Sequence, residues 1–323
     1  MPSSRKDPMT GRRNDYDVTN RIQTTDPRDI RDEIGRIFEK LYPDRCDTAI
    51  ARAIDDAARL FQGEYPGFSA CDTGYHDLQH TLDVTLAMAR IMAGYIGQGH
   101  GPLIDADLFA FGIAAALFHD AGYIRRYGDH RHFHGAEYTK IHVSRSGRFL
   151  RNYLGTIGLE RFADAAAPTV HFTGYELPAQ HIRVPAPVFR LLGNMLGSAD
   201  IIAQMSDRCY LEKCYERLYP EFVLGGIDRK TGEDGKEELL FRSAEDLLFH
   251  TPQFYRKAME RLHRQLDAMM RFAADARQQR NLYIEEAEKN IRYAAKLADR
   301  GDASALRRLP PSRANARRRA RAG

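Results

Sequence analysis

An adjacent histidine and aspartate, His119 and Asp120, follow the most apolar run of the chain, Leu108 to Phe118. Ionisable side chains at the end of a buried segment are costly unless they are paired or bind something. A divalent metal ion would be such a partner, because imidazole and carboxylate groups are ligands of Zn, Mn, Fe and Mg. Adjacent His-Asp pairs are also common on protein surfaces, so the doublet becomes informative only together with its neighbours.

Further candidate ligands lie on both sides of the doublet. His80 stands upstream in the segment YHDLQHTLDV, and Asp200 follows an apolar helix start downstream. This order of an isolated His, a His-Asp doublet and a distant Asp resembles the HD superfamily of metal-dependent phosphohydrolases. The resemblance spans residues 75–212. It implies an HD-type helical bundle in which these four side chains bind a divalent metal.

Two histidines between the doublet and Asp200 suggest a second metal. In two-metal members of the superfamily, additional histidines occupy comparable places, and the resemblance implies that His142 and His171 hold a second ion with Asp120 as the bridge. His134, in the histidine-rich loop DHRHFH, is an alternative second-site ligand. The expected cofactor is therefore one or two divalent ions of Mn, Fe, Zn, Mg or Ni.

The segment that contains His80 also resembles the signature of cyclic-nucleotide phosphodiesterases. In that signature a Tyr-His-Asn triplet precedes the first metal histidine, and its histidine protonates the leaving oxygen. The match implies that His76 is the general acid, and its four-residue spacing from His80 lets both share one helix face. Asp77 stands in place of the Asn, and Ala-Gly-Tyr follows the doublet where those enzymes have a second His. The chain is therefore not a close member of that group.

These residues predict a metal-dependent phosphohydrolase that acts on a small phosphoester, such as a cyclic nucleotide or nucleotide. The ion would lower the pKa of the attacking water. Asp120 would orient that water, and Arg145 and Lys213 are candidate cations for the substrate. A mixed-valent di-iron oxygenase of the same superfamily has the same ligand set, and a non-catalytic nucleotide-binding HD module is the third alternative. His76, an acid beside the metal, favours the hydrolase.

The surrounding sequence predicts an all-α domain over residues 26–302, with the motif core at 75–212 and additional C-terminal helices over 243–300. Apolar residues recur at helical spacing, and Asp26, Asp47, Asp105 and Ser243 are expected caps. Residues 225–236 read as a loop or short hairpin. The expected helices span 27–41, 47–61, 80–91, 105–119, 134–154, 160–170, 187–205, 252–277 and 282–298.

Composition narrows the cellular setting. Seven of the 48 basic residues lie in the tail after residue 302, and without them the chain has 41 basic and 44 acidic residues. Nucleic acid is therefore not an expected partner, the basic tail excepted. Residues 1–25 and 303–323 are expected to be disordered. Four cysteines without a C-x-x-C pair, no signal sequence and no apolar run of membrane length predict a cytoplasmic protein. The amphipathic C-terminal helices could pack on the core or pair two chains, so a homodimer is one alternative.

Overall fold

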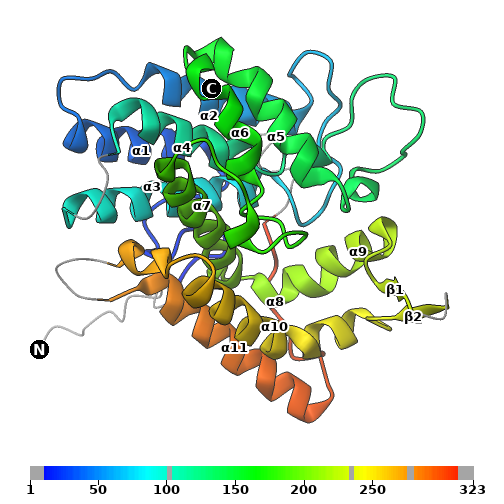
Figure 1. Cartoon of the computed structure of the whole chain (residues 1–323). Helices are drawn as coiled ribbons and strands as arrows, with labels where there is room; N and C mark the ends of the chain where they lie inside the picture. The colour runs from blue at the N-terminus through cyan, green and yellow to red at the C-terminus, as the bar shows by residue number, and fades with distance from the viewer. Residues whose placement is uncertain (1–10, 100–103, 233–235, 275–279, 312–323) are drawn as a thin grey trace, which may run out of the picture.

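The chain is described by a computed structural model over residues 11–99, 104–232, 236–274 and 280–311. It is mostly helical, with one antiparallel two-stranded ribbon (Figure 1), which confirms the all-α prediction. The ribbon consists of β1 (Arg229–Thr231) and β2 (Glu237–Leu239). The α-helices are α1 (Pro27–Leu41), α2 (Thr48–Gln62), α3 (Leu78–Gly97), α4 (Ala106–Phe118), α5 (His142–Tyr153), α6 (Ala163–Val170), α7 (Pro187–Ser206), α8 (Tyr210–Lys213), α9 (Tyr219–Gly225), α10 (Ala244–Arg264) and α11 (Leu282–Arg300).

Three of the expected caps form. The side chains of Asp26, Asp105 and Ser243 accept hydrogen bonds from backbone amides in the first turns of α1, α4 and α10, at 3.0, 2.8 and 3.2 Å. Such a bond satisfies one of the amides that a helix start leaves unpaired. Asp47 precedes α2 without a side-chain cap.

Two expected helices differ from prediction. The segment 134–154 divides into a 3₁₀ turn (Gly135–Tyr138) and α5, which begins only at His142. In contrast, α10 continues through Pro252, whose missing amide would have bonded to the Leu248 carbonyl. The Thr251 hydroxyl donates to that carbonyl instead, at 2.7 Å. The helix then ends at Arg264, well before residue 277.

The helices form one core around α3. This helix packs against α1, α4 and α7, while α10 and α11 pack against each other and against α7 (Figure 1). Every residue of α4 from Phe109 to Phe118 is buried. The two central helices thereby carry their ends, where the candidate ligands lie, into the interior of the molecule.

Both terminal segments were expected to be disordered, and their described parts instead contact the body. The Asp17 carboxylate is buried and lies 2.6 Å from the Arg90 guanidinium of α3. Arg12 donates to the Ser206 carbonyl at 2.7 Å, and Asn14 donates to the Leu309 carbonyl at 3.1 Å. The disorder prediction is wrong for residues 11–25 and 303–311, and residues 1–10 and 312–323 lie outside the described residues.

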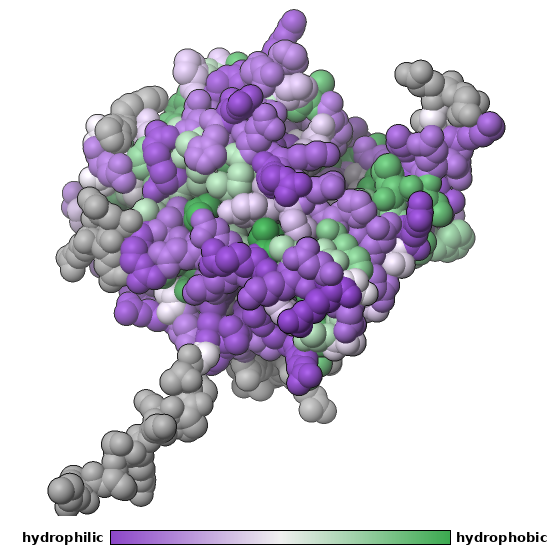
Figure 2. Space-filling view, turned by 90° about the horizontal axis from the view of Figure 1, so that it is seen from below, coloured by the Kyte–Doolittle hydropathy of each residue, from purple (hydrophilic) through white to green (hydrophobic). Residues whose placement is uncertain are grey.

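Among the described helices, none combines the length and the apolarity needed to cross a bilayer. The face drawn in Figure 2 is largely hydrophilic, with apolar groups gathered at its right. Exposed apolar side chains do occur on α9 and β2, at Val223, Leu224 and Leu239. Of the cysteines, Cys46 is exposed, whereas Cys71, Cys209 and Cys214 are buried.

Candidate metal centre

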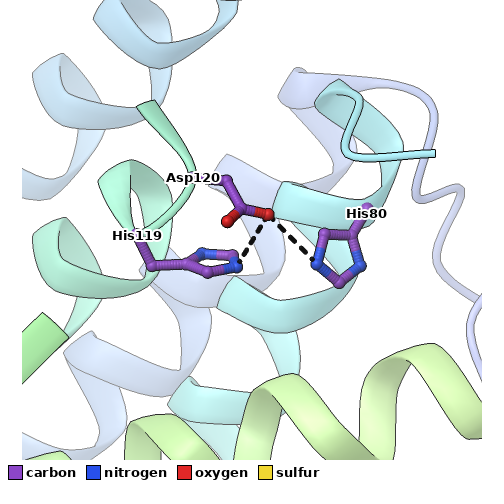
Figure 3. Close-up of side chains that lie close together, drawn as sticks. All are labelled: His80, His119 and Asp120. Atoms are coloured by element: carbon purple, nitrogen blue, oxygen red, sulfur yellow. Dashed lines mark ion pairs between the residues drawn. The ribbon is translucent and has the colours of Figure 1, made fainter. Parts of the chain in front are cut away.

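His80, His119 and Asp120 form one buried group at the junction of two core helices (Figure 3). His80 lies in the first turn of α3, where the Asp77 carboxylate accepts from its backbone amide at 3.0 Å. His119 caps the C-terminus of α4, and Asp120 precedes a 3₁₀ turn, η1 (Ala121–Tyr123). One ligand atom from each of the three side chains lies within 4.8 Å of the others.

The atoms that face each other in this group have the character of metal ligands. The Asp120 Oδ2 atom lies 3.2 Å from His119 Nε2 and 3.5 Å from His80 Nε2 (Figure 3). His119 Nδ1 lies 2.7 Å from the Ala116 carbonyl, so it carries the proton and Nε2 is left with its lone pair. Both His119 Nε2 and Asp120 Oδ2 are buried without a hydrogen-bond partner in the described structure. Because a cation would satisfy both atoms, the group could hold a metal ion.

Asp200 reaches the same two histidines from α7. Its Oδ1 atom lies 3.4 Å from His80 Nε2 and 3.9 Å from His119 Nε2. Burial alone would lower the pKa of His80, but the carboxylates of Asp120 and Asp200 raise it to about 10. Burial likewise opposes ionisation of Asp120, yet the adjacent histidines hold its pKa well below the ordinary value. The fold thus brings together all four first-site residues that the sequence suggested.

His142 approaches the other oxygen of Asp120. It is the first residue of α5, its Nδ1 atom lies 2.6 Å from the Thr139 carbonyl, and its Nε2 atom lies 3.7 Å from Asp120 Oδ1. Burial lowers the pKa of this imidazole, which favours the neutral form that binds metals. The two oxygens of Asp120 therefore face different histidines, as a bridging carboxylate requires.

His171 and His134 do not join this group. His171 is the half-buried C-cap residue of α6, outside the buried face that Ala165, Ala166, Thr169 and Val170 form. Within the described ranges its ring makes no ion pair or ring contact with the candidate ligands. The His134 imidazole accepts from the Ala136 amide at 3.1 Å and caps a 3₁₀ turn. Neither assignment as a ligand has geometric support.

A buried glutamate that sequence reasoning missed pairs with His76. The Glu221 Oε2 atom lies 2.6 Å from His76 Nδ1, and the other Glu221 oxygen accepts from the backbone amide of Tyr75. Glu221 lies on α9, which follows α8 and a π-helical turn over Cys214–Leu218. Local widening of a helix of this kind is frequent near functional sites.

His76 lies just before α3, so the expected sharing of one helix face with His80 is wrong. Its ring nevertheless lies 5.9 Å from the His80 ring and stacks on Tyr123 at 4.5 Å. Tyr123 stacks in turn on His142 at 4.3 Å, so it stands beside both histidines. Burial lowers the pKa of His76, but the Glu221 charge and hydrogen bond raise it above the ordinary value overall. Glu221 thus favours the protonated form of an imidazole that lies beside the group of candidate ligands.

The two cations expected to contact a substrate have protein partners instead. Lys213 is buried, with its ammonium 2.5 Å from Asp207 Oδ2 and 3.1 Å from Gln79 Oε1. Arg145 donates to the carbonyls of Gly122 and Ile124 at 2.7 and 3.1 Å. Lys213 therefore neutralises a buried carboxylate, and Arg145 fastens the turn that follows Asp120.

Tyr175, on the loop after α6, is a second residue that sequence reasoning missed. Arg261 of α10 donates to the carbonyls of Phe172 and Gly174 at 2.7 and 2.6 Å, and its guanidinium lies 4.0 Å from the Tyr175 ring. Tyr175 is itself 59% exposed, so Arg261 holds an aromatic ring at the surface of the loop after α6.

The arrangement combines a candidate metal group, a histidine–glutamate pair beside it and an aromatic ring, Tyr123, that stacks on His76 and His142. Such a set can bind a cation, hold it in fixed geometry and present a proton donor to a ligand. Comparison of the chain with protein-family models, with curated proteins and with solved structures finds no significant match.

Proposed function

We propose that the chain is a metal-dependent phosphohydrolase of the HD superfamily that cleaves a small phosphoester, such as a cyclic nucleotide or nucleotide. His80, His119, Asp120 and Asp200 would hold the first ion, and His142 would hold a second one that shares Asp120. A divalent ion bound there would supply a nucleophilic water at neutral pH and neutralise charge that develops on the phosphoryl oxygens.

The observation that carries the proposal is the pairing of His76 with Glu221 at 2.6 Å. Hydrolysis of a phosphoester needs a proton for the departing oxygen, and a positioned histidine is suited to deliver it. Glu221 accepts from His76 Nδ1, which leaves Nε2 as the atom that can donate. The His76 side chain keeps 18% of its surface exposed and that of His142 keeps 17%, whereas that of His119 keeps 1%, so a ligand can reach His76 beside the candidate ligands.

The test is hydrolysis of bis(p-nitrophenyl) phosphate and of cyclic and linear nucleotides by protein reconstituted with Mn²⁺, Fe²⁺ or Zn²⁺. We expect a diester to yield a phosphomonoester and an alcohol, and a monoester to yield inorganic phosphate and an alcohol. His76→Ala should lower the rate with the nucleotides by roughly 10²- to 10⁴-fold, the usual contribution of a general acid, and should affect bis(p-nitrophenyl) phosphate less, because p-nitrophenolate leaves without a proton. His263→Ala is the matched control, because His263 is an exposed histidine of α10. Equal activity of His76→Ala and the wild type would remove His76 from the mechanism.

A di-iron oxygenase is the second candidate, and the place of His142 favours it as much as it favours a hydrolase. A carboxylate that faces histidines on both sides suits any dinuclear centre. The distinguishing result would be iron-dependent O₂ uptake without phosphoester cleavage. Nucleotide binding with neither reaction would instead indicate a non-catalytic module.

A further inference from the structure

A separate pocket of about 360 Å³ lies against the turn that follows the His-Asp doublet. Its polar lining consists of Arg126, Arg145 and Arg148, and its apolar wall includes Phe68 and Phe149. The backbone of η1 closes one side. None of the candidate metal ligands lines this pocket, and neither does His76, so it is distinct from the metal centre.

The lining is cationic and contains no carboxylate. Arg126 and Arg148 are exposed and form no ion pair with the residues that the structure describes. The Arg126 guanidinium lies over the Phe68 ring, 5.4 Å from its centroid. Arg145 uses Nε and Nη2 on backbone carbonyls, so Nη1 has no hydrogen bond to any described residue. Donor groups of all three arginines are therefore available to a ligand.

The positive charges influence one another. The pKa of Arg145 lies below its ordinary value, first because of burial; Asp129 opposes the shift, while Arg126 and Arg148 add to it. Gathering like charges at a half-buried position costs free energy, which a bound anion would recover. In contrast, Arg125 is paired with Asp72 at 3.1 Å, and Arg151 is paired with Asp164 at 3.2 Å.

We propose that this pocket binds a small phosphate-bearing molecule, with its oxyanion held by Arg126, Arg145 and Arg148. Guanidinium groups match phosphate oxygens in geometry and form charge-assisted hydrogen bonds with them. The Phe68 and Phe149 rings, 5.5 Å apart in an edge-to-face contact, exclude water from one side and strengthen these bonds. The volume is within the range of sites for small molecules.

Calorimetric titration with pyrophosphate at low salt tests the proposal. The Asp120→Ala variant is titrated beside the wild type, because it disables the metal centre as a competing place for the anion. We expect the two proteins to bind pyrophosphate with similar affinity, and Arg126→Ala/Arg148→Ala to bind at least about ten-fold more weakly, since hydrogen bonds to charged groups are the strong ones. Arg151→Ala, an exposed arginine of the same helix α5, should bind as the wild type does.

Three results would overturn the proposal. The first is that the wild type does not bind pyrophosphate. The second is that Arg151→Ala loses as much pyrophosphate affinity as the double variant does. The third is that Asp120→Ala alone loses binding, which would place the anion on the metal centre. Tighter binding of AMP than of inorganic phosphate would assign the aromatic wall to a nucleobase, and equal binding would assign recognition to the oxyanion. Because binding is measured in a variant without the metal centre, failure of the proposed hydrolase would leave this result intact.

Discussion

Asp120 is the residue that all three histidines of the candidate metal centre approach. One of its oxygens lies 3.2 Å from His119 and 3.5 Å from His80, and the other lies 3.7 Å from His142. A single carboxylate oxygen cannot serve two ions as well as two separate oxygens can. The division of its oxygens between two sets of histidines is therefore the main structural argument that the centre takes two ions.

Glu221 should set the pH range of activity through His76. Because the Glu221 charge raises the pKa of His76 above its ordinary value, the acid keeps its proton to higher pH than a free imidazole does, and activity should fall as pH rises through the raised pKa. Glu221→Gln preserves the shape and removes the charge. The basic limb of the kcat profile should then move to lower pH, and kcat at neutral pH should fall about ten-fold.

The pH–rate profile of Glu221→Gln is best compared with that of Glu216→Gln, since Glu216 is an exposed glutamate in the preceding turn. The control should retain the wild-type profile. A basic limb that is the same in Glu221→Gln and the wild type would show that His76 does not titrate in the rate-limiting step.

The sequence marks the four candidate first-site residues but not the partner of His76. His119 and Asp120 are marked by the apolar run before them, and His80 and Asp200 by their order along the chain. Glu221 lies 145 residues from His76, and nothing in its local spacing distinguishes it from Glu216. Only the fold, which places α9 beside the segment 74–76 before α3, makes the pair.

At the scale of elements, the contact between η1 and α5 sets the distance between Asp120 and His142. A Cβ atom on Gly122 would lie 2.0 Å from the His142 carbonyl oxygen and 2.8 Å from Ser146 Oγ. Gly122→Ala must therefore push α5 away from the doublet. We expect a loss of about 2 kcal/mol or more in the free energy of unfolding, as overpacking typically costs, and weaker binding of a second ion.

Urea unfolding in the presence of EDTA measures the stability part of this prediction without any contribution from metal. Gly97→Ala is the control, because a Cβ at that last position of α3 meets nothing within 4 Å. Glycine to alanine in a helix is ordinarily neutral or slightly stabilising. Equal stability of Gly122→Ala and the wild type would mean that α5 does not rest on the turn as described.

The starts of three helices could be predicted because capping is local. The continuation of a helix through a proline and the point where it ends could not. Asp26, Asp105 and Ser243 act within three residues of themselves. Continuation of α10 through Pro252 depends on the Thr251 hydroxyl, and the end of that helix depends on positive φ angles at Asp267 and Ala268. The spacing of apolar residues along the sequence does not indicate these features of the backbone.

At the scale of the whole molecule, the N-terminal segment supplies a charge to the core. The Asp17 carboxylate and the Arg90 guanidinium lie 2.6 Å apart, and Arg90 also donates to the Tyr283 hydroxyl at 2.9 Å. Asp17→Ala would leave Arg90 buried without its carboxylate. Breaking a buried pair in this way costs about 3 kcal/mol or more of unfolding free energy, which urea unfolding at neutral pH can measure.

Asp55→Ala is the comparison, because it breaks an exposed pair with Arg31 at 3.2 Å and should cost less than about 1 kcal/mol. Burial raises the pKa of Asp17, but the charge of Arg90 and hydrogen bonds to the carboxylate lower it by more than burial raises it. The pKa in the folded protein therefore lies below the ordinary value. Its contribution to stability is therefore present above the ordinary pKa of an aspartate and is lost as pH falls through the folded value. Similar stability losses in both variants would contradict a structural role for the segment.

Composition could not predict that parts of the terminal segments are ordered. Residues 11–25 are polar and lack periodicity, yet the buried Asp17 carboxylate and a hydrogen bond from Arg12 to the last residue of α7 hold them against the body. Long-range pairing of single charges leaves no pattern in the sequence. The domain therefore includes more of the chain than apolar spacing suggests.

The central claim is that the buried group of His80, His119 and Asp120 is a metal centre, and metal content by elemental analysis tests it most directly. After reconstitution with Mn²⁺, Fe²⁺ or Zn²⁺ and removal of free ion, the wild type should retain one or two equivalents per chain. Asp120→Ala should retain almost none, and His263→Ala should match the wild type. A wild-type protein that retains no ion, or an Asp120→Ala variant that retains the full amount, would contradict the account.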